Sequence, residues 1–97
     1  MLMKLKPTVP YTEIMDAFRK DAPIFASIDG LHWKIWLENK EEGTVAGVYY
    51  FKNQASFDKF QAFDLESVGH AGGMFDVLSV EVFDVIEEFS KVTRAPL

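Results

Sequence analysis

Five aromatic residues are the side chains of this sequence best suited to form a ligand site. Rings can wall a pocket for a flat apolar molecule, and Trp and Tyr keep a hydrogen-bonding group beside an apolar body. We predict that these residues contact a small aromatic ligand: Trp33, Trp36, Tyr49, Tyr50 and Phe83. The alternative is that most of them fill the hydrophobic core and a subunit interface, as large apolar side chains usually do.

Few polar residues accompany these rings. Lys34 and Glu81 could orient a ligand. An interior ion pair, or a side chain that extends its charge to a solvent-exposed rim, is the more common role of such residues. His70 is the candidate catalytic base, because a glycine-rich loop such as 69–73 can lie over a pocket. A solvent-exposed histidine is the alternative. The remaining catalytic residues stay unknown at this stage.

The sequence lacks the residues that several other kinds of functional site require. We predict no metal site, because His32 and His70 are far apart and form no i, i+4 ligand pair. The chain contains no cysteine, which excludes disulfides and thiolate ligands. The glycines of 69–73 follow a predicted helix and precede no Lys-Ser/Thr pair, so they do not form a phosphate-binding loop. No serine lies in a G-x-S-x-G motif.

The elements that must position these side chains follow the order β-α-β-β-α-β, with a short helix at the end. Strands are predicted at 1–6, 31–38, 44–52 and 74–83, and helices start after the N-caps Thr12, Asn53 and Asp84. Pro23 predicts a kink or two short helices in the first helical region, and Gly30 is a suitable left-handed C-cap. This order is that of a ferredoxin-like α+β fold with an antiparallel sheet.

Alternation along the strands predicts which side chains share a face. In the second strand we expect one apolar face against the helices and one mixed face toward a partner, the former with Leu31, Trp33, Ile35 and Leu37 and the latter with His32, Lys34, Trp36 and Glu38. In the last strand we expect Leu78, Val80 and Val82 on one face and Val77, Ser79, Glu81 and Phe83 on the other. The third strand is apolar on both faces, which indicates a sheet covered on both sides.

Composition narrows the assembly and the partners. The 97 residues form one domain, 1–97, in which 48% of residues are hydrophobic and 14% aromatic. This surplus of apolar side chains predicts a homodimer that packs sheet against sheet. A net charge of −5 and a first strand without aromatic residues argue against an RNA-binding module and any other nucleic-acid partner. No apolar run is long enough for a signal peptide or a membrane span, so we expect a cytoplasmic protein with no membrane partner.

Four segments carry a family resemblance that extends nearly end to end. They are 22–28 (APIFASI), 30–36 (GLHWKIW), 46–51 (AGVYYF) and the close of the chain at 82–85 (VFDV) and 92–97 (VTRAPL). Together they resemble the YdhR-like mono-oxygenases of the dimeric α/β-barrel superfamily. Ala46 stands where the family pattern has a second glycine, and 63–73 differ in length and content, so no role for His70 carries over.

The resemblance implies a homodimeric α/β barrel with a cavity between sheet and helices in each subunit. It also implies an enzyme, a mono-oxygenase that uses O2 on a small aromatic compound with no metal, flavin or haem as cofactor. Such chemistry suits hydroquinone- or polyphenol-like substrates, whose anions can pass an electron to oxygen once the protein has bound, desolvated and helped to deprotonate them. The alternative is a non-catalytic small-ligand-binding or stress-related dimer of the same fold.

Overall fold

A computed structural model of the chain describes residues 1–67 and 74–97, with side chains described for 1–61 and 74–97. The elements are β1 (Leu2–Pro7), α1 (Tyr11–Ala26), β2 (Leu31–Asn39), β3 (Thr44–Phe51), α2 (Gln54–Ser67), β4 (Phe75–Glu81) and α3 (Glu87–Val92). The four strands form one antiparallel sheet in the order β2-β3-β1-β4. The predicted ferredoxin-like α+β fold with a short C-terminal helix is therefore confirmed.

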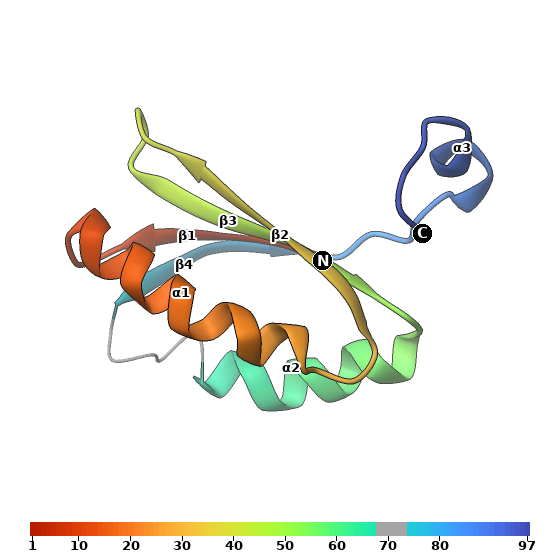
Figure 1. Cartoon of the computed structure of the whole chain (residues 1–97), viewed down its shortest axis with the longest axis horizontal. Helices are drawn as coiled ribbons and strands as arrows, with labels where there is room; N and C mark the ends of the chain where they lie inside the picture. Colours follow the sequence, from red (N-terminus) through yellow and green to blue (C-terminus); the bar gives the residue numbers. More distant parts are fainter. Residues whose placement is uncertain (68–73) are drawn as a thin grey trace.

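The helices α1 and α2 lie on one side of the sheet, whereas α3 stands apart from it at the end of an extended segment (Figure 1). The buried core lies between the sheet and these two helices, and consists of Met3, Leu5, Ile14, Phe25, Val45, Tyr49, Phe60 and Phe75. Because Val45 and Tyr49 are both buried there, the alternation predicted for the third strand is confirmed on its helix side. No helix within the described residues lies over the opposite face of the sheet (Figure 1).

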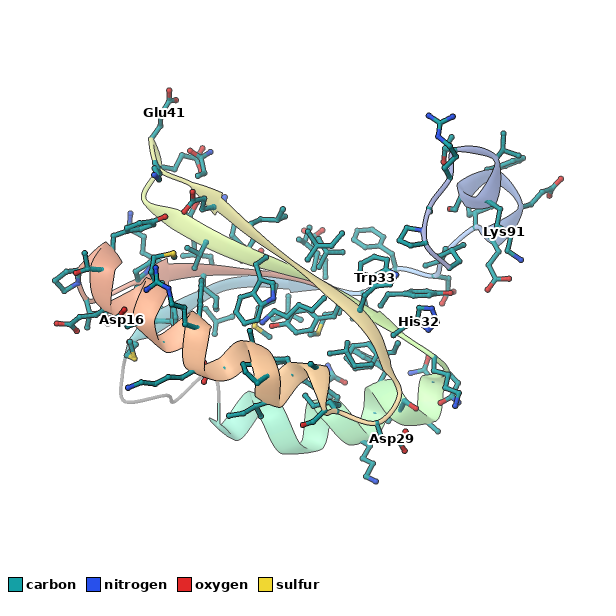
Figure 2. The ribbon with its side chains drawn as sticks, viewed as in Figure 1. Asp16, Asp29, His32, Trp33, Glu41 and Lys91 are labelled. Carbon is teal, nitrogen blue, oxygen red and sulfur yellow. The ribbon has the colours of Figure 1, made fainter. Side chains whose placement is uncertain are left out.

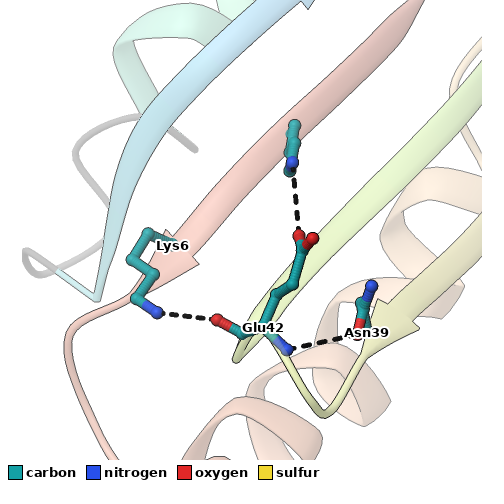
Figure 3. A network of polar contacts seen from close by, with 4 residues as sticks. Lys6, Asn39 and Glu42 are labelled. Atoms are coloured by element: carbon teal, nitrogen blue, oxygen red, sulfur yellow. Dashed lines mark hydrogen bonds and ion pairs between the residues drawn. The ribbon is translucent and has the colours of Figure 1, made fainter.

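The turn between β2 and β3 is held by polar contacts that also tie it to β1 (Figure 3). The backbone N–H of Glu42 donates to Oδ1 of Asn39 at 3.2 Å, and Nζ of Lys6 donates to the Glu42 carbonyl at 2.9 Å. Nζ of Lys4 lies 3.5 Å from the Glu42 carboxylate. Gly43 adopts a φ of 66°, a conformation that glycine tolerates without a steric penalty. These contacts fix the hairpin and thereby the alignment of β2 with β3.

The predicted starts of two helices were wrong. α1 begins at Tyr11 with Pro10 as its N-cap, because the Pro10 carbonyl already accepts the N–H groups of Glu13 and Ile14. Thr12 is thus inside the helix rather than its cap. α3 begins at Glu87 with Ile86 as N-cap, so Asp84 lies too far upstream to cap it. The prediction for Asn53 is confirmed, since its Oδ1 accepts the Ser56 N–H at 2.8 Å.

Of the two outcomes predicted for Pro23, a kink or two short helices, the second was wrong. α1 continues through Pro23 and ends at Ala26, with Ser27 as its C-cap. Gly30 does adopt a positive φ of 85°, but in the turn that enters β2 and not at the helix terminus itself. Beside it, Ser56 occupies the space where a Cβ of residue 30 would lie. Glycine is required here by both the backbone conformation and the close approach of α2.

The faces predicted for β2 were reversed. Lys34 pairs with Tyr49 and Trp36 with Gly47, and Tyr49 is buried toward the helices, so Lys34 and Trp36 face the helices as well. Trp33, paired with Tyr50, lies on the opposite face. The reason is a register shift between Leu31 and Trp33, which breaks the alternation at the start of the strand. Leu31 still packs against the core, whereas Ile35 and Leu37 are exposed on the side without helices.

A second register shift changes the predicted faces of β4. Val77 pairs with Leu5, and Ser79 pairs with Lys4, the neighbour of Leu5 in β1. Because adjacent residues of β1 point to opposite faces, Val77 and Ser79 do so too, although strict alternation had placed them together. Leu78 is the extra residue of this bulge and is 51% exposed.

Candidate functional site

A groove of about 300 Å³ lies between the second half of α1 and the first half of β2. Its lining residues are Ala22, Phe25, Ala26, Leu31, His32, Trp33, Lys34 and Trp36. A recess of about 20 Å³ shares Phe25, Lys34 and Trp36 with the groove. It is otherwise bounded by core residues such as Tyr49, by Asp21 of α1 and by Ala46 and Gly47 of β3. We call the groove and this recess together the α1–β2 chamber.

The ammonium group of Lys34 lies among the rings of the chamber. Its Nζ is 3.7 Å from the ring centroid of Phe25, 3.5 Å from that of Trp36 and 4.6 Å from that of Tyr49. The negative faces of aromatic rings attract a cation at such distances, by about 0.5–2 kcal/mol for each good contact. The three rings come from α1, β2 and β3, so tertiary packing creates this surrounding for the charge.

The rings are held in place by contacts with one another. Trp36 packs against Phe18 with centroids 4.8 Å apart and meets Phe25 edge-on at 5.5 Å. Phe25 in turn lies 6.0 Å from Tyr49. Aromatic pairs in these tilted and edge-on arrangements are favourable beyond the area they bury. The walls of the chamber are therefore ordered before any ligand enters.

Gly47 makes room for this arrangement on the floor of the sheet. A Cβ at residue 47 would lie 3.0 Å from Cε of Lys34 and 2.9 Å from Cε1 of Tyr49. The separation from Tyr49 is shorter than real Cβ contacts, and the separation from Lys34 is tight enough that the lysine side chain would have to shift. The absence of a side chain at Gly47 therefore lets the Lys34 side chain and the Tyr49 ring cross the strand at this point.

The structure does not bring the five predicted aromatic residues together. Trp36 and Tyr49 lie in the chamber, but the Trp33 ring packs on Tyr50, with centroids 5.3 Å apart, although Trp33 also contributes to the groove lining. The indole N–H of Trp33 donates to the Pro96 carbonyl at 2.8 Å. Figure 2 places His32 and Trp33 at the end of β2 that is nearest to the C-terminal segment.

A second cavity contains the other predicted residues. Tyr50 and Phe83 line a space of about 250 Å³ with residues of α2 and of the chain after β4, and Tyr49 borders it as well. Phe83 is 66% exposed. Tyr49 is thus the predicted residue common to this cavity and the α1–β2 chamber. Glu81 lies opposite Leu2 at the end of β4, and His70 lies outside the described residues.

A third cavity, of about 450 Å³, was not predicted from the sequence. It lies where the β2–β3 hairpin approaches the start of α1, and its lining includes Lys6, Tyr11, Glu38, Lys40 and Thr44. The Tyr11 hydroxyl donates to Glu38, and this hydrogen bond raises the pKa of Tyr11. Its residues come from four separate elements, so no local sequence pattern could have revealed it.

Two further findings concern the described part of the chain. No group of three or more histidines or carboxylates there is close enough to hold a metal ion. No helix within those residues has the length and apolar character needed to cross a membrane.

A comparison with protein families finds a match that covers almost the whole chain. Residues 2–96 match the family described as "Putative mono-oxygenase ydhR". No curated protein matches the chain at a significant level. The match includes every element that builds the chamber and also the C-terminal segment that contacts Trp33. The chain therefore belongs to the ydhR mono-oxygenase family.

Proposed function

We propose that the protein oxidises a small electron-rich aromatic compound with O2 and that the compound binds in the α1–β2 chamber. The observation that carries the proposal is the position of Lys34, whose ammonium lies 3.5–3.7 Å from the Phe25 and Trp36 ring centroids at the wall of this space. Rings suit a flat substrate, and a cation suits the oxygen of a phenol or hydroquinone. Membership of a mono-oxygenase family supports the oxidation chemistry.

The reaction needs no metal, flavin or haem in this proposal, because the substrate supplies the electrons. A hydroquinone anion transfers an electron to O2, and the two radicals then combine on the ring. One oxygen atom stays on the product, a hydroxyquinone, and the other leaves as water. The protein binds and desolvates the substrate and favours its anion, which are contributions that a chamber of fixed rings and one cation can make.

We propose in addition that the working protein is a homodimer. The six residues of α3 include no buried side chain, and Phe89 and Val92 are 62% and 77% exposed. An isolated helix of this length is not stable in water unless its apolar side packs against something. Ile35 and Leu37, on the uncovered face of the sheet, need the same protection. A second copy related by two-fold symmetry can cover both surfaces at once.

Oxygen uptake tests the proposed activity. We expect the purified protein to accelerate O2 consumption by at least one hydroquinone of a panel that differs in ring size and substitution, without added cofactor. Trp36→Leu should lower this rate at least tenfold, because Trp36 borders both parts of the chamber. Lys52→Met is the control, since the exposed Lys52 side chain lies outside the lining of the chamber. No uptake above buffer across the panel contradicts the proposal.

Ligand binding without turnover is the second candidate function. It is favoured by the small number of proton acceptors, since Asp21 and His32 are the carboxylate and imidazole among the described lining residues of the chamber. Quenching of Trp36 fluorescence by an aromatic ligand, in a Trp33→Phe background and without oxygen uptake, would support this function over the first. The cytoplasmic location inferred from the sequence stays a prediction.

A further inference from the structure

We propose that the cavity lined by Tyr50 and Phe83 binds a small quaternary ammonium ion. This cavity has a volume of about 250 Å³ and lies between the end of β3, the start of α2 and the chain after β4. We call it the β3–α2 cavity. Among the described lining residues it shares Tyr49 alone with the α1–β2 chamber, and the proposal does not depend on the oxidation proposed there.

The first argument is the set of aromatic rings that line the cavity. Tyr50 and Phe51 come from β3, Phe57 from α2 and Phe83 from the chain after β4. The rings of Phe51 and Phe57 lie 5.4 Å apart at an angle of 62°, so the wall contains ring surfaces in different planes. The negative face of a ring attracts a cation, by about 0.5–1 kcal/mol at exposed sites. Rings from three segments can therefore contact one cation from several sides.

The second argument is the sign of the charge on the lining side chains. Among the residues that the structure describes there, the charged side chains are Asp84 and Glu87. Glu87 accepts a long hydrogen bond from the Tyr50 hydroxyl at 3.5 Å and lies 4.0 Å from Nζ of Lys91. The Asp84 carboxylate forms no hydrogen bond or ion pair with any described residue. The two carboxylates favour a cation, and the net charge of −5 on the chain attracts one from solution.

The two lining amides do not change this sign, because both are engaged within α2. Oδ1 of Asn53 accepts the Ser56 N–H at 2.8 Å. Nε2 of Gln54 donates to the Asp58 carboxylate at 2.9 Å. Neither amide group is therefore directed by its contacts toward a ligand, and recognition depends on the rings and the carboxylates.

One positive group in the described lining opposes the carboxylates. The Met1 ammonium lies at the edge of the cavity and donates to the Tyr49 carbonyl at 2.8 Å. Burial lowers the pKa of this ammonium from its ordinary value of 8.0, because desolvation disfavours the charged form. At pH 8.5 most of the Met1 amine is therefore neutral. We choose this pH for the test, so that the side-chain carboxylates determine the charge of the cavity.

The third argument is the match between these rings and a methylated cation. A quaternary ammonium ion has no N–H group that the rings would leave unpaired, and its methyl groups present the charge on an apolar surface. A primary ammonium would have to give up strongly held water to reach the same rings. Pockets for drug-sized ligands measure about 300–1,000 Å³, so this cavity suits a smaller molecule. Such a ligand would also cover Phe83, which is 66% exposed.

The test compares choline with 3,3-dimethylbutan-1-ol, an uncharged alcohol of the same shape in which carbon replaces the nitrogen. Each compound is titrated with wild-type protein at pH 8.5 and low salt, and the NMR signal of its methyl protons gives the Kd. We expect choline to bind at least tenfold more tightly than the alcohol, because only choline has a charge that the rings and carboxylates attract. Equal affinities, or no binding of choline, overturn the proposal.

Two related compounds define the ligand class. Ethanolamine, a primary amine, should bind several-fold more weakly than choline, because its ammonium is more strongly hydrated. Phosphocholine has the same trimethylammonium group beside a phosphate, and it should also bind more weakly, because Asp84 and Glu87 repel the phosphate. Tighter binding of ethanolamine would assign the cavity to primary amines. Tighter binding of phosphocholine would assign it to a phospholipid head group, and either result overturns the proposal.

Two substitutions locate the binding of choline. Asp84→Asn removes a charge at nearly constant shape, so it should weaken choline several-fold and leave binding of the alcohol unchanged. Phe83→Leu removes a ring but keeps an apolar side chain, and it should also weaken choline several-fold. Glu88→Gln is the matched control, because it removes the same charge from an exposed residue of α3 outside the described lining.

The outcomes of these variants decide the assignment. Asp84 and Phe83 are exposed, so both variants should fold, and circular dichroism checks this. Equal loss of choline affinity in Asp84→Asn and Glu88→Gln would attribute binding to the net charge of the chain and overturn the assignment. Unchanged affinity in both Asp84→Asn and Phe83→Leu would overturn it as well. Hydroquinone oxidation should be unaffected in each variant, since none of these residues lines the chamber.

Discussion

At the scale of single residues, the decisive feature is one lysine in an aromatic surrounding. Lys34 gains its character from Phe25, Trp36 and Tyr49, which lie on three elements, and from Gly47, which has no side chain to displace it. Lysine in a strand is usually a solvent residue, so its type alone does not mark it as functional. Only the packing of these neighbours does.

Substitution of Gly47 tests this arrangement. We expect Gly47→Ala to destabilise the protein by about 1–3 kcal/mol, because a methyl group would press on the buried Tyr49 ring and on the Lys34 stem. It should also weaken hydroquinone binding several-fold, as measured by quenching of Trp36 fluorescence in a Trp33→Phe background. Val48→Ala, on the other face of β3 and outside the lining of the chamber, is the matched control. It should lower stability modestly and leave binding unchanged. Equal loss of binding in both variants would contradict the role of Gly47.

The Tyr11–Glu38 hydrogen bond predicts a pH dependence outside the chamber. Because this bond raises the pKa of Tyr11, the folded state holds the tyrosine proton more tightly than the unfolded state does. Its contribution to stability is present below the ordinary tyrosine pKa of about 10 and disappears as the pH rises through the raised value. We expect the unfolding curves of wild type and Tyr11→Phe to converge at strongly alkaline pH.

A pH titration followed by tyrosinate absorbance tests whether the Glu38 carboxylate causes the raised pKa of Tyr11. The tyrosinate absorbance lost in Tyr11→Phe should titrate above the ordinary tyrosine pKa of about 10 in the wild type. In Glu38→Gln this absorbance should shift to lower pH, because the carboxylate no longer accepts from the hydroxyl or repels the tyrosinate. An identical titration in wild type and Glu38→Gln would exclude the hydrogen bond as the cause.

At the scale of elements, the site depends on how α1 and β2 lie against each other. Phe18 and Phe25 of α1 pack on Trp36 of β2, and these contacts form one wall of the chamber. The helix reaches Phe25 although Pro23 lies in its last turns and cannot donate a backbone hydrogen bond. Its packing on the sheet therefore outweighs the local penalty of the proline.

Replacement of Pro23 measures how much stability the helix loses because this residue has no backbone N–H donor. Pro23 is exposed, so Pro23→Ala removes little packing and restores a backbone donor. We expect the free energy of unfolding, measured by urea denaturation, to rise by about 1–3 kcal/mol. If Pro23 also directs the last turn, hydroquinone binding should weaken at the same time. Ile24→Ala, at an equally exposed neighbouring position, controls for loss of side-chain surface. A drop in stability of Pro23→Ala would show that the ring makes contacts that outweigh the missing donor.

At the scale of the whole molecule, apolar surface is distributed unevenly. The helix side of the sheet is packed, whereas the opposite face and the segment after β4 expose Ile35, Leu37, Phe89 and Val92. Trp33 links these regions through its hydrogen bond to Pro96. A partner copy is the proposed cover for them.

Charged substitutions on α3 test whether the protein is a dimer. We expect wild-type protein to sediment at twice the 11.1 kDa of one chain at micromolar concentration, and Phe89→Asp combined with Val92→Asp to sediment as a monomer. Both side chains are exposed within one chain, so a monomer would tolerate the change with little loss of stability. Lys91→Gln, in the same helix, should leave the mass unchanged. A wild-type mass of 11.1 kDa across the concentration range would refute the dimer.

The order of elements and the fold class could be predicted from the sequence, because each rests on local signals. Apolar periodicity, Asn53 as a helix cap, the glycine before β2 and the polar turn of the hairpin each act within a few residues. The segments around Trp33 and Tyr49 also carried the family resemblance that the match over residues 2–96 confirms. The sequence by itself thus determined the succession of strands and helices and the family.

The tertiary structure decided which side of the sheet each functional side chain faces. β2 has large apolar residues on both faces, so alternation could divide Trp33 from Trp36 but could not say which belonged inside. The register shift at Leu31 and Trp33 and the pairing of Trp36 with Gly47 resolved this, and both depend on contacts between separate strands. The same long-range pairing put Lys34 among three rings. The physical reason is that a strand with apolar side chains on both faces can place either face against the helices. Its pairing register with the neighbouring strand, and the space that this neighbour leaves open, decide between the two.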